Sequence, residues 1–231
     1  MSRVSTRRTV RTSGLLALFT ACAFAAPPST GVGTRPPTAN AAPCEACHGA
    51  SGQGAPPAAI PRLAGQSADY LEKQLRDYEN GSRENPVMRN FARGLRDSER
   101  AQLASYYASL WAPHAPPVVP DNALKVDPQQ LVRGRQLATE GAESERVQAC
   151  DNCHGPEGSG LPHSAPYLAG QSVEYLESQL KAWQQGTRKN DAGKQMVSVA
   201  EQLNSADVTA VSAYFASLDA GQGKELATPV P

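Results

Sequence analysis

The chain has 231 residues with 22 basic and 22 acidic side chains, and aromatic residues make up only 6% of it. This length suits one ordinary domain or two small ones, and so few aromatic side chains leave little material for a large apolar core. The chain also lacks the basic excess that nucleic-acid binding needs, so we exclude that class of function. No stretch inside the chain is apolar over the length of a membrane span.

Residues 1–25 have the features of an export signal. Four arginines and no acidic residue precede the apolar run "GLLALFTACAFAA", which contains the small residues Ala23 and Ala25 at which a signal peptidase would cut. Cleavage there starts the mature chain at Ala26 and leaves it a formal charge of about −4. Cys22, which ends the short stretch "FTAC", leaves a lipid-anchored form as the alternative.

The remaining chain repeats one unit twice. The stretch "CEACHGASGQG" from Cys44 matches "CDNCHGPEGSG" from Cys150, and "YYASL" near the end of the first copy matches "YFASL" near the end of the second. Such internal similarity predicts two homologous domains, which we assign to residues 42–112 and 128–219. Proline-rich stretches at residues 26–41 and 113–127 predict an N-terminal segment and a linker, and residues 220–231 form a C-terminal tail.

Both copies are predicted to be all-α. In each, a serine suited to cap a helix precedes Tyr and Leu residues at helical spacing, and a glycine ends the pattern. These helices run from Ser67 to Gly81 and from Ser172 to Gly186. A last helix is predicted from near Asp97 in the first copy and from near Asn204 in the second. The segment "PQQLVRGRQLATEG" predicts one more helix at the start of the second copy, whereas the proline-rich stretch before Cys44 cannot form its counterpart.

Each copy carries a C-x-x-C-H motif, which is the attachment pattern of haem c. On a helical turn the two cysteines fall on one side and the histidine follows, so all three side chains can face one flat cofactor. The sulfurs then form thioethers with the porphyrin vinyl groups, and the imidazole binds the iron. The predicted residues are Cys44 and Cys47 with the iron ligand His48, and Cys150 and Cys153 with the iron ligand His154.

Zinc binding and dithiol redox chemistry are the alternatives for these cysteines. A closed zinc site needs four ligands, and each copy offers two cysteines and one adjacent histidine. A thioredoxin-like pair needs a strand–helix–strand context, for which neither copy has the pattern. The repetition of the motif at matching places in the two copies therefore favours two covalent haem c groups.

Met88 and Met196 are the predicted sixth ligands of the two irons. They are the only methionines after Met1 and lie one in each copy, 108 residues apart, which is also the separation of the two "ASL" ends. Core packing is the alternative role of a methionine. Thioether coordination raises the reduction potential of the haem and leaves no position on the iron open for a substrate. We therefore predict two His/Met-ligated haems that carry electrons, and we predict no catalytic residue.

Taken together, these motifs resemble cytochrome c4 and its di-haem relatives. The resemblance runs from about Cys44 to Leu218 and includes, in both copies, C-x-x-C-H-G, P-x-L-A-G-Q, G-x-R and the final A-S-L. It implies two tandem cytochrome c class I domains in pseudo-twofold contact, with the haem propionates near their interface. It also implies that the carbonyl oxygens of Pro61 and Pro166 accept the Nδ1 protons of the two haem histidines.

The resemblance further implies a function in electron transport. We expect a periplasmic carrier of the respiratory chain that moves electrons from a quinol-oxidising complex or a dehydrogenase to an acceptor such as a terminal oxidase. Its partners would be redox proteins, and membrane association would need a lipid anchor or a membrane complex. A haem subunit of a larger dehydrogenase and a catalytic di-haem enzyme, such as a thiosulfate dehydrogenase, are the alternatives. Because the family's helix before the first cysteine is missing, the first haem is expected to be more exposed or covered by another chain.

Two further histidines and a group of arginines complete the candidate residues. His114 lies in the predicted linker and His163 in the loop "GLPHSAP", where we expect solvated side chains, with His163 as an alternative ligand of the second haem. We also expect a basic rim around Met88 that guides an acidic redox partner. It consists of Arg83, Arg89, Arg93, Arg96 and Arg100.

Overall fold

The computed structural model describes residues 41–55, 58–110, 127–163 and 165–218. These residues lie within one compact unit, Arg35–Pro231. The predicted signal peptide, almost all of the N-terminal segment and the linker, the tail and His114 lie outside the described residues. Within the described ranges there are nine α-helices and three 3-10 helices, and β-pairing is limited to four isolated bridges. This confirms the predicted all-α fold class.

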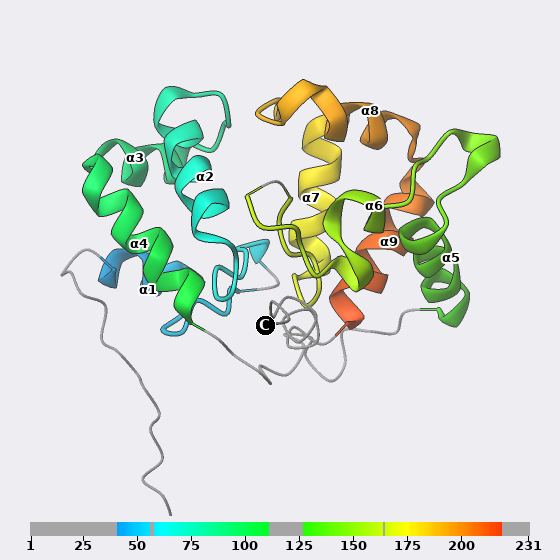
Figure 1. The fold of residues 1–231 in the computed structure, drawn as a ribbon, viewed down its shortest axis with the longest axis horizontal. Helices are drawn as coiled ribbons and strands as arrows, with labels where there is room; N and C mark the ends of the chain where they lie inside the picture. The colour runs from blue at the N-terminus through cyan, green and yellow to red at the C-terminus, as the bar shows by residue number, and fades with distance from the viewer. Residues whose placement is uncertain (1–40, 56–57, 111–126, 164, 219–231) are drawn as a thin grey trace, which may run out of the picture. The chain divides into compact units, whose positions relative to one another are not determined.

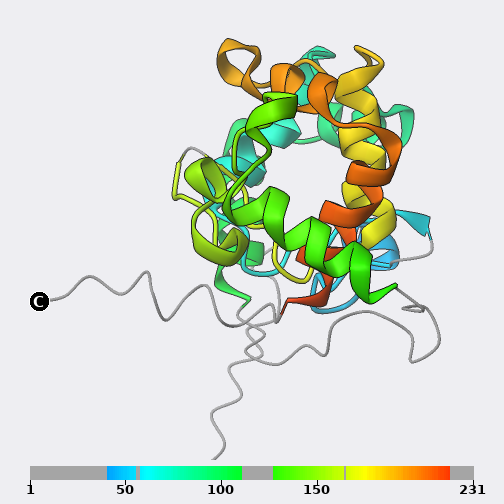
Figure 2. The same ribbon diagram turned by 90° about the vertical axis from the view of Figure 1, so that its right-hand side faces the viewer.

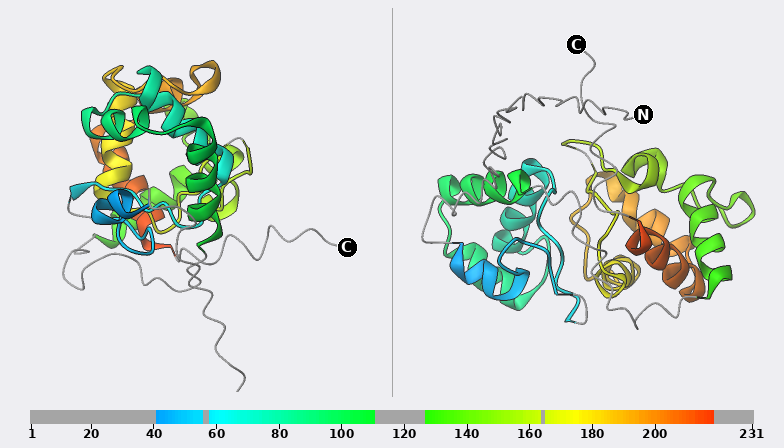
Figure 3. Two further views of the ribbon diagram at one scale, coloured as in Figure 1. Left: turned by 90° about the vertical axis from the view of Figure 1, so that its left-hand side faces the viewer. Right: turned by 90° about the horizontal axis from the view of Figure 1, so that it is seen from below.

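The described part of the first copy has four α-helices (Figure 1). They are α1 (Ala42–His48), α2 (Ala68–Asn80), α3 (Pro86–Arg93) and α4 (Asp97–Ser109). Helix α2 packs against both α3 and α4, and Figure 3 gives two further views, with α1 in blue. The main buried apolar cluster is small and consists of Ala41, Leu71, Leu103, Ala104, Tyr106 and Tyr107.

The second copy has the same helices and one more at its start. They are α5 (Pro128–Thr139), α6 (Asp151–His154), α7 (Val173–Gln184), α8 (Gln195–Gln202) and α9 (Ser205–Ser217), with the 3-10 helices η2 (Glu143–Glu145), η3 (Pro156–Gly158) and η4 (Ala192–Lys194). The predicted extra helix is α5. It crosses α9, as Figure 2 shows in green and orange-red, and Arg133 Nε donates to Asp207 Oδ1 at 2.7 Å between the two helices.

The crossing of α5 and α9 is close because α5 has a glycine at the contact. A Cβ atom built on Gly134 would lie 2.1 Å from the carbonyl oxygen of Ala210, so no side chain fits between the two backbones. On the matching face of α4, Gln102 and Ser105 are exposed, whereas their counterparts Ala210 and Ala213 on α9 are each only 2% exposed. Helix α4 thus has polar residues on the face that corresponds to the α5-binding face of α9. This agrees with the sequence before Cys44, which has no pattern for a helix like α5.

The predicted serine caps are present in both copies. Ser67 Oγ accepts a hydrogen bond from Tyr70 N at 3.2 Å, and Ser172 Oγ accepts one from Tyr175 N at 3.2 Å. Helix α2 ends at Gly81, whose φ of 84° is left-handed. Helix α7 instead ends at Gln184, two residues before the glycine that was predicted to end it.

None of the helices in the described part of the chain combines the length and the apolar character needed to cross a lipid bilayer.

Candidate functional site

Each C-x-x-C-H motif ends in a buried histidine that is held by the same hydrogen bond. His48 ends α1 and His154 ends α6, and their exposed fractions are 6% and 7%. Nδ1 of His48 lies 2.9 Å from the carbonyl oxygen of Pro61, and Nδ1 of His154 lies 2.9 Å from that of Pro166. Because a carbonyl oxygen only accepts, Nδ1 carries the proton and Nε2 keeps its lone pair for a metal. Both proline contacts are confirmed.

The surroundings keep these imidazoles neutral. Burial lowers the pKa of His48 below its ordinary value, against the smaller opposing effect of the Pro61 carbonyl. Burial also lowers the pKa of His154, and the positive charge of Arg188 acts in the same direction. A neutral imidazole is the form that binds iron, so both residues suit the predicted role.

In both copies, the first cysteine of the motif is partly buried and the second is exposed. Cys44 and Cys150 pack against the two apolar cores, whereas Cys47 and Cys153 are exposed. Burial raises the pKa of the Cys150 thiol to about 12, and it also raises that of Cys44. Reactive dithiols and thiolate metal ligands need the opposite, a lowered thiol pKa. The surroundings therefore favour attachment of haem over a zinc or dithiol site.

The two methionines occupy matching places at the starts of short helices. Met88 is the third residue of α3 and Met196 is the second residue of α8, and both side chains are partly buried. The Met88 N–H donates to Asn85 Oδ1 at 3.0 Å, and the Met196 N–H donates to Asp191 Oδ2 at 2.8 Å. Asn85 is the N-cap of α3, so its side chain fixes where this helix begins. Asp191 lies three residues before the N-cap of α8, and its carboxylate holds the first turn of α8 and so the main chain of Met196. Their role as iron ligands stays a prediction.

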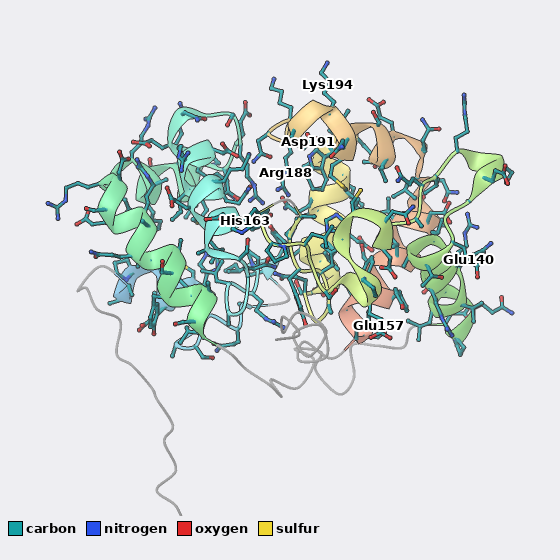
Figure 4. All side chains as sticks on the ribbon, viewed as in Figure 1. Glu140, Glu157, His163, Arg188, Asp191 and Lys194 are labelled. Atoms are coloured by element: carbon teal, nitrogen blue, oxygen red, sulfur yellow. The ribbon has the colours of Figure 1, made fainter. Side chains whose placement is uncertain are left out.

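The loop histidine His163 is exposed, as expected. Its side chain is 80% exposed, and its Nδ1 makes a hydrogen-bond contact with Asp69 Oδ2 of α2. Figure 4 labels His163 together with Arg188 and Asp191. The contact with Asp69 was not foreseen.

The predicted basic rim is wrong for two of its five arginines. Arg83 is 4% and Arg100 is 6% exposed, so neither offers its charge to a docking partner. Arg100 Nη1 pairs with Glu79 Oε2 at 2.8 Å, and the same guanidinium pairs with Asp97. Three exposed or partly exposed arginines remain near Met88, namely Arg89, Arg93 and Arg96.

A symmetric pair of glutamines joins the two copies. Gln66 Nε2 donates to the Tyr167 carbonyl oxygen at 2.6 Å, and Gln66 Oε1 accepts from Tyr167 N at 3.0 Å. Gln171 makes the same two contacts with the main chain of Arg62, at 2.7 and 3.0 Å. Both glutamines are only 5% exposed. Sequence reasoning missed this role, although the glutamine ends the "LAGQ" stretch in both copies.

The described residues fit haem c on their own chemistry. Each copy has two thiols one helical turn apart, followed by a buried neutral imidazole whose Nε2 is not engaged by the proline contact. The main buried cluster of the first copy has six residues, two of which are alanines. A core of this size needs additional apolar material for stability, which a porphyrin provides.

Comparison with known proteins identifies the family. The cytochrome c family model matches two segments, residues 38–111 and 131–219. A protein of Stutzerimonas stutzeri (strain A1501) named "Thiosulfate dehydrogenase electron acceptor" is 41% identical over 76% of this chain and 78% of its own length. A protein of the same name from Thiomonas intermedia (strain K12) is 38% identical over 91% of both chains. Cytochrome c4 of Pseudomonas aeruginosa is 36% identical over 78% of this chain and 86% of its own.

Solved structures agree with this result. The reduced recombinant cytochrome c4 from Pseudomonas stutzeri has a TM-score of 0.68 and 32% identity, covering 77% of this chain and 94% of that one. Thiosulfate dehydrogenase (TsdBA) from Marichromatium purpuratum also has a TM-score of 0.68, with 37% identity over 76% of this chain. This chain spans only 36% of the length of that protein. The chain therefore belongs to the cytochrome c family, as a di-haem member with two class I domains of the cytochrome c4 kind.

Proposed function

We propose that this protein is an exported electron carrier that accepts electrons from a thiosulfate-oxidising dehydrogenase and passes them to a terminal acceptor. The protein carries two haem c groups and functions in electron transfer. Each haem supplies one reversible one-electron step without bond making. The identity of the donor and of the acceptor is the proposal.

The haem sites are assigned to the residues that the two motifs bring together. We propose that Cys44 and Cys47 hold the first haem, with His48 and Met88 as its iron ligands. We propose the same roles for Cys150, Cys153, His154 and Met196 at the second. The observation that best supports this assignment is the pair of buried histidines, each with Nδ1 held 2.9 Å from a proline carbonyl oxygen. A ligand fixed in this way keeps its orientation in both oxidation states, which favours fast electron transfer.

The relatives' names support the proposed donor. Two relatives that match most of this chain are named as electron acceptors of thiosulfate dehydrogenase. A thiosulfate dehydrogenase structure contains a region similar to this chain within a longer polypeptide. That arrangement also favours the second candidate function, in which this protein is a haem subunit bound permanently to a dehydrogenase.

We also propose that the protein works in the periplasm. The predicted signal at residues 1–25 would export the chain to the compartment where haem c is attached. Cys22 leaves the lipid-anchored form as the variant of this proposal.

Reduction by a purified dehydrogenase tests the proposed donor. When oxidised protein is mixed in a stopped-flow instrument with thiosulfate and a thiosulfate dehydrogenase, we expect reduction of both haems within the enzyme's turnover time. A mono-haem cytochrome c of similar potential serves as the control and is expected to be reduced at least tenfold more slowly. Equal rates would contradict the proposed donor. Reduction by thiosulfate without the dehydrogenase would instead favour the catalytic alternative.

Replacement of either methionine tests the iron ligands. In Met88→Ala and in Met196→Ala we expect the long-wavelength methionine–iron absorption band to lose about half its intensity, because each change removes one thioether ligand. The reduction potential of the affected haem should fall, and its iron should bind carbon monoxide. Each variant is the control for the other, and His163→Ala should leave the band unchanged. A full band in either methionine variant would exclude that residue as a ligand.

A further inference from the structure

The two copies differ at one buried ring beside the first cysteine of each motif. Tyr107 lies in the last turn of α4 (Figure 1), and Phe215 is its counterpart near the end of α9. They are the second residues of "YYASL" and "YFASL". Both side chains are 3% exposed. The first copy therefore has a buried hydroxyl group at a place where the second copy has none.

The two rings occupy equivalent places in their copies. A Cβ atom built on Gly52 would lie 2.8 Å from Cδ1 of Tyr107, and one built on Gly158 would lie 2.8 Å from Cδ1 of Phe215. In both copies the main-chain carbonyl oxygen of this residue also accepts a hydrogen bond from the glycine of the "LAGQ" stretch, at 3.0 and 2.9 Å. The hydroxyl group is thus added to a ring whose position the two copies share.

The sulfur next to each ring has different polar neighbours. Cys44 packs against the apolar cluster that contains Tyr107, and Cys150 packs against the cluster that contains Phe215. In the second copy the carbonyl oxygen of Leu137, on α5, lies 3.7 Å from Cys150 Sγ. The first copy has no counterpart of α5 among its described residues. Its sulfur therefore has no such carbonyl neighbour from a leading helix in that part of the chain.

The hydroxyl group of Tyr107 has an unused hydrogen. Its oxygen is buried and meets no partner with full hydrogen-bond geometry among the described residues. Buried hydroxyl groups are rarely left unpaired in folded proteins. The chain around Tyr107 therefore leaves room for an acceptor that the hydroxyl group does not yet reach in full.

The Cys44 sulfur is close enough to act on this hydroxyl group. Burial raises the pKa of Tyr107, and the Cys44 sulfur adds to the effect through its charge and through a hydrogen bond. Burial likewise raises the pKa of Cys44, and the hydrogen bond with Tyr107 opposes it. Both directions are those of a phenol that donates and a sulfur that accepts.

Attachment of haem would fix this direction. A thioether sulfur has no hydrogen to donate, so it only accepts, and the Tyr107 O–H is the donor. The positive end of the O–H dipole then lies at a sulfur that is bonded to the porphyrin and draws electron density from it. Hydrogen bonds to groups around a haem tune its reduction potential in this way. At Cys150 the Leu137 carbonyl turns the negative end of its dipole toward the sulfur.

We infer that Tyr107 tunes the first haem, because its hydroxyl group donates a hydrogen bond to the Cys44 thioether sulfur and so raises the reduction potential of that haem. The second haem lacks this donor, since Phe215 has no hydroxyl group. One residue thereby helps to separate the potentials of the two copies. The inference rests on the proposed attachment through Cys44 and is independent of the proposed electron donor.

Removal of the hydroxyl group tests this role. In Tyr107→Phe we expect a spectroelectrochemical titration to show one of the two reduction potentials lowered and the other unchanged. The expected change is at least threefold in one reduction equilibrium, about 28 mV at 59 mV per tenfold change for a one-electron couple. The ring itself is kept, so the packing against Gly52 stays as it is.

Tyr106→Phe is the matched control. It removes a hydroxyl group from the neighbouring residue, which is also buried at 8% exposed and has its ring centre 5.1 Å from that of Tyr107. Burial and the charge of Glu45 raise the pKa of Tyr106, without a contribution from Cys44. Both potentials should therefore stay unchanged. A Tyr107→Phe protein with the same potentials as Tyr106→Phe would disprove the inference, and so would equal shifts of both haems.

The vibration of the carbon–sulfur bond tests the acceptor. In resonance Raman spectra we expect one component of the thioether C–S stretching band to shift in Tyr107→Phe and to stay in place in Tyr106→Phe. In the unmodified protein the same component should shift in deuterated water, because the phenolic hydrogen exchanges. A lowered potential with unchanged C–S bands would show that the hydroxyl group acts through another acceptor, and would overturn the assignment to the sulfur.

Failure of the attachment itself has a different signature. Two covalently bound haems in a protein with Cys44→Ser and Cys47→Ser would refute the proposed haem site. Unshifted potentials in Tyr107→Phe, with two covalently bound haems still present, would refute only the role of Tyr107.

Discussion

Replacing Cys150 and Cys153 with serine is expected to reduce the covalently bound haem from two per chain to one. The serine hydroxyl does not form the thioether, so the second haem loses both covalent bonds while the first C-x-x-C-H motif stays intact. The haem-to-protein ratio of the purified protein, measured after denaturation and extraction, checks this result. Two covalently bound haems in this variant would contradict the assignment.

The matching change in the first copy is expected to cost more structure. Cys44→Ser with Cys47→Ser should also leave one haem. The main buried cluster of the first copy, however, has six residues against ten in the second, and the first copy has no counterpart of α5 among its described residues. Without haem, a core this small does not hold a domain together. We therefore expect a larger loss of helical circular dichroism in this variant than in the Cys150/Cys153 variant. Equal losses would contradict the different dependence on haem.

Replacing Gly134 with alanine is expected to destabilise the second copy by about 2 kcal/mol. The new Cβ would lie 2.1 Å from the Ala210 carbonyl oxygen and 2.8 Å from Tyr214 Cβ, so α5 and α9 must move apart. A clash with a backbone atom at this distance lies at the upper end of the cost of overpacking, about 3 kcal/mol, and the better helix propensity of alanine offsets about 1 kcal/mol of it. Thermal unfolding of the holoprotein should show a midpoint lowered by on the order of 10 °C.

Gly94→Ala is the matched control for this change. Gly94 has an ordinary right-handed φ of −79°, and its nearest neighbour to an added Cβ is 3.4 Å away. Its effect should stay within about 0.5 kcal/mol, as for most surface substitutions. A Gly134→Ala protein as stable as Gly94→Ala would mean that the two helices do not cross as closely as described.

Features with a local cause could be predicted from the sequence. A serine cap needs only its own side chain and the N–H groups three residues on, which is why Ser67 and Ser172 are both correct. The C-x-x-C-H motif likewise carries its chemistry within one helical turn. The proline contacts of His48 and His154 followed from the resemblance to a family and not from local spacing.

Features that depend on contact between the copies could not be predicted. From the sequence, Arg83 is predicted to be a surface arginine near Met88, because the residues around it do not indicate that Tyr175 and Gln179 of the other copy will bind it and bury it. Arg100 was also mispredicted, but for a reason within the first copy, since its partner Glu79 lies on another helix of that copy. The internal repeat could have indicated the role of Arg83, because the same arginine occurs in both G-x-R stretches. A residue that is identical in both copies and has no local role is a candidate for the interface between them.

The glutamine pair has a consequence for how two duplicated domains can diverge. A side-chain amide that bonds to a main-chain N–H and C=O recognises groups that every residue except proline offers. Substitution of the residues whose main chain the glutamines bind therefore leaves the contact between the copies intact. The two copies already differ at these positions, with arginine at position 62 and tyrosine at position 167. Only proline, which has no N–H, is barred from both places by this contact.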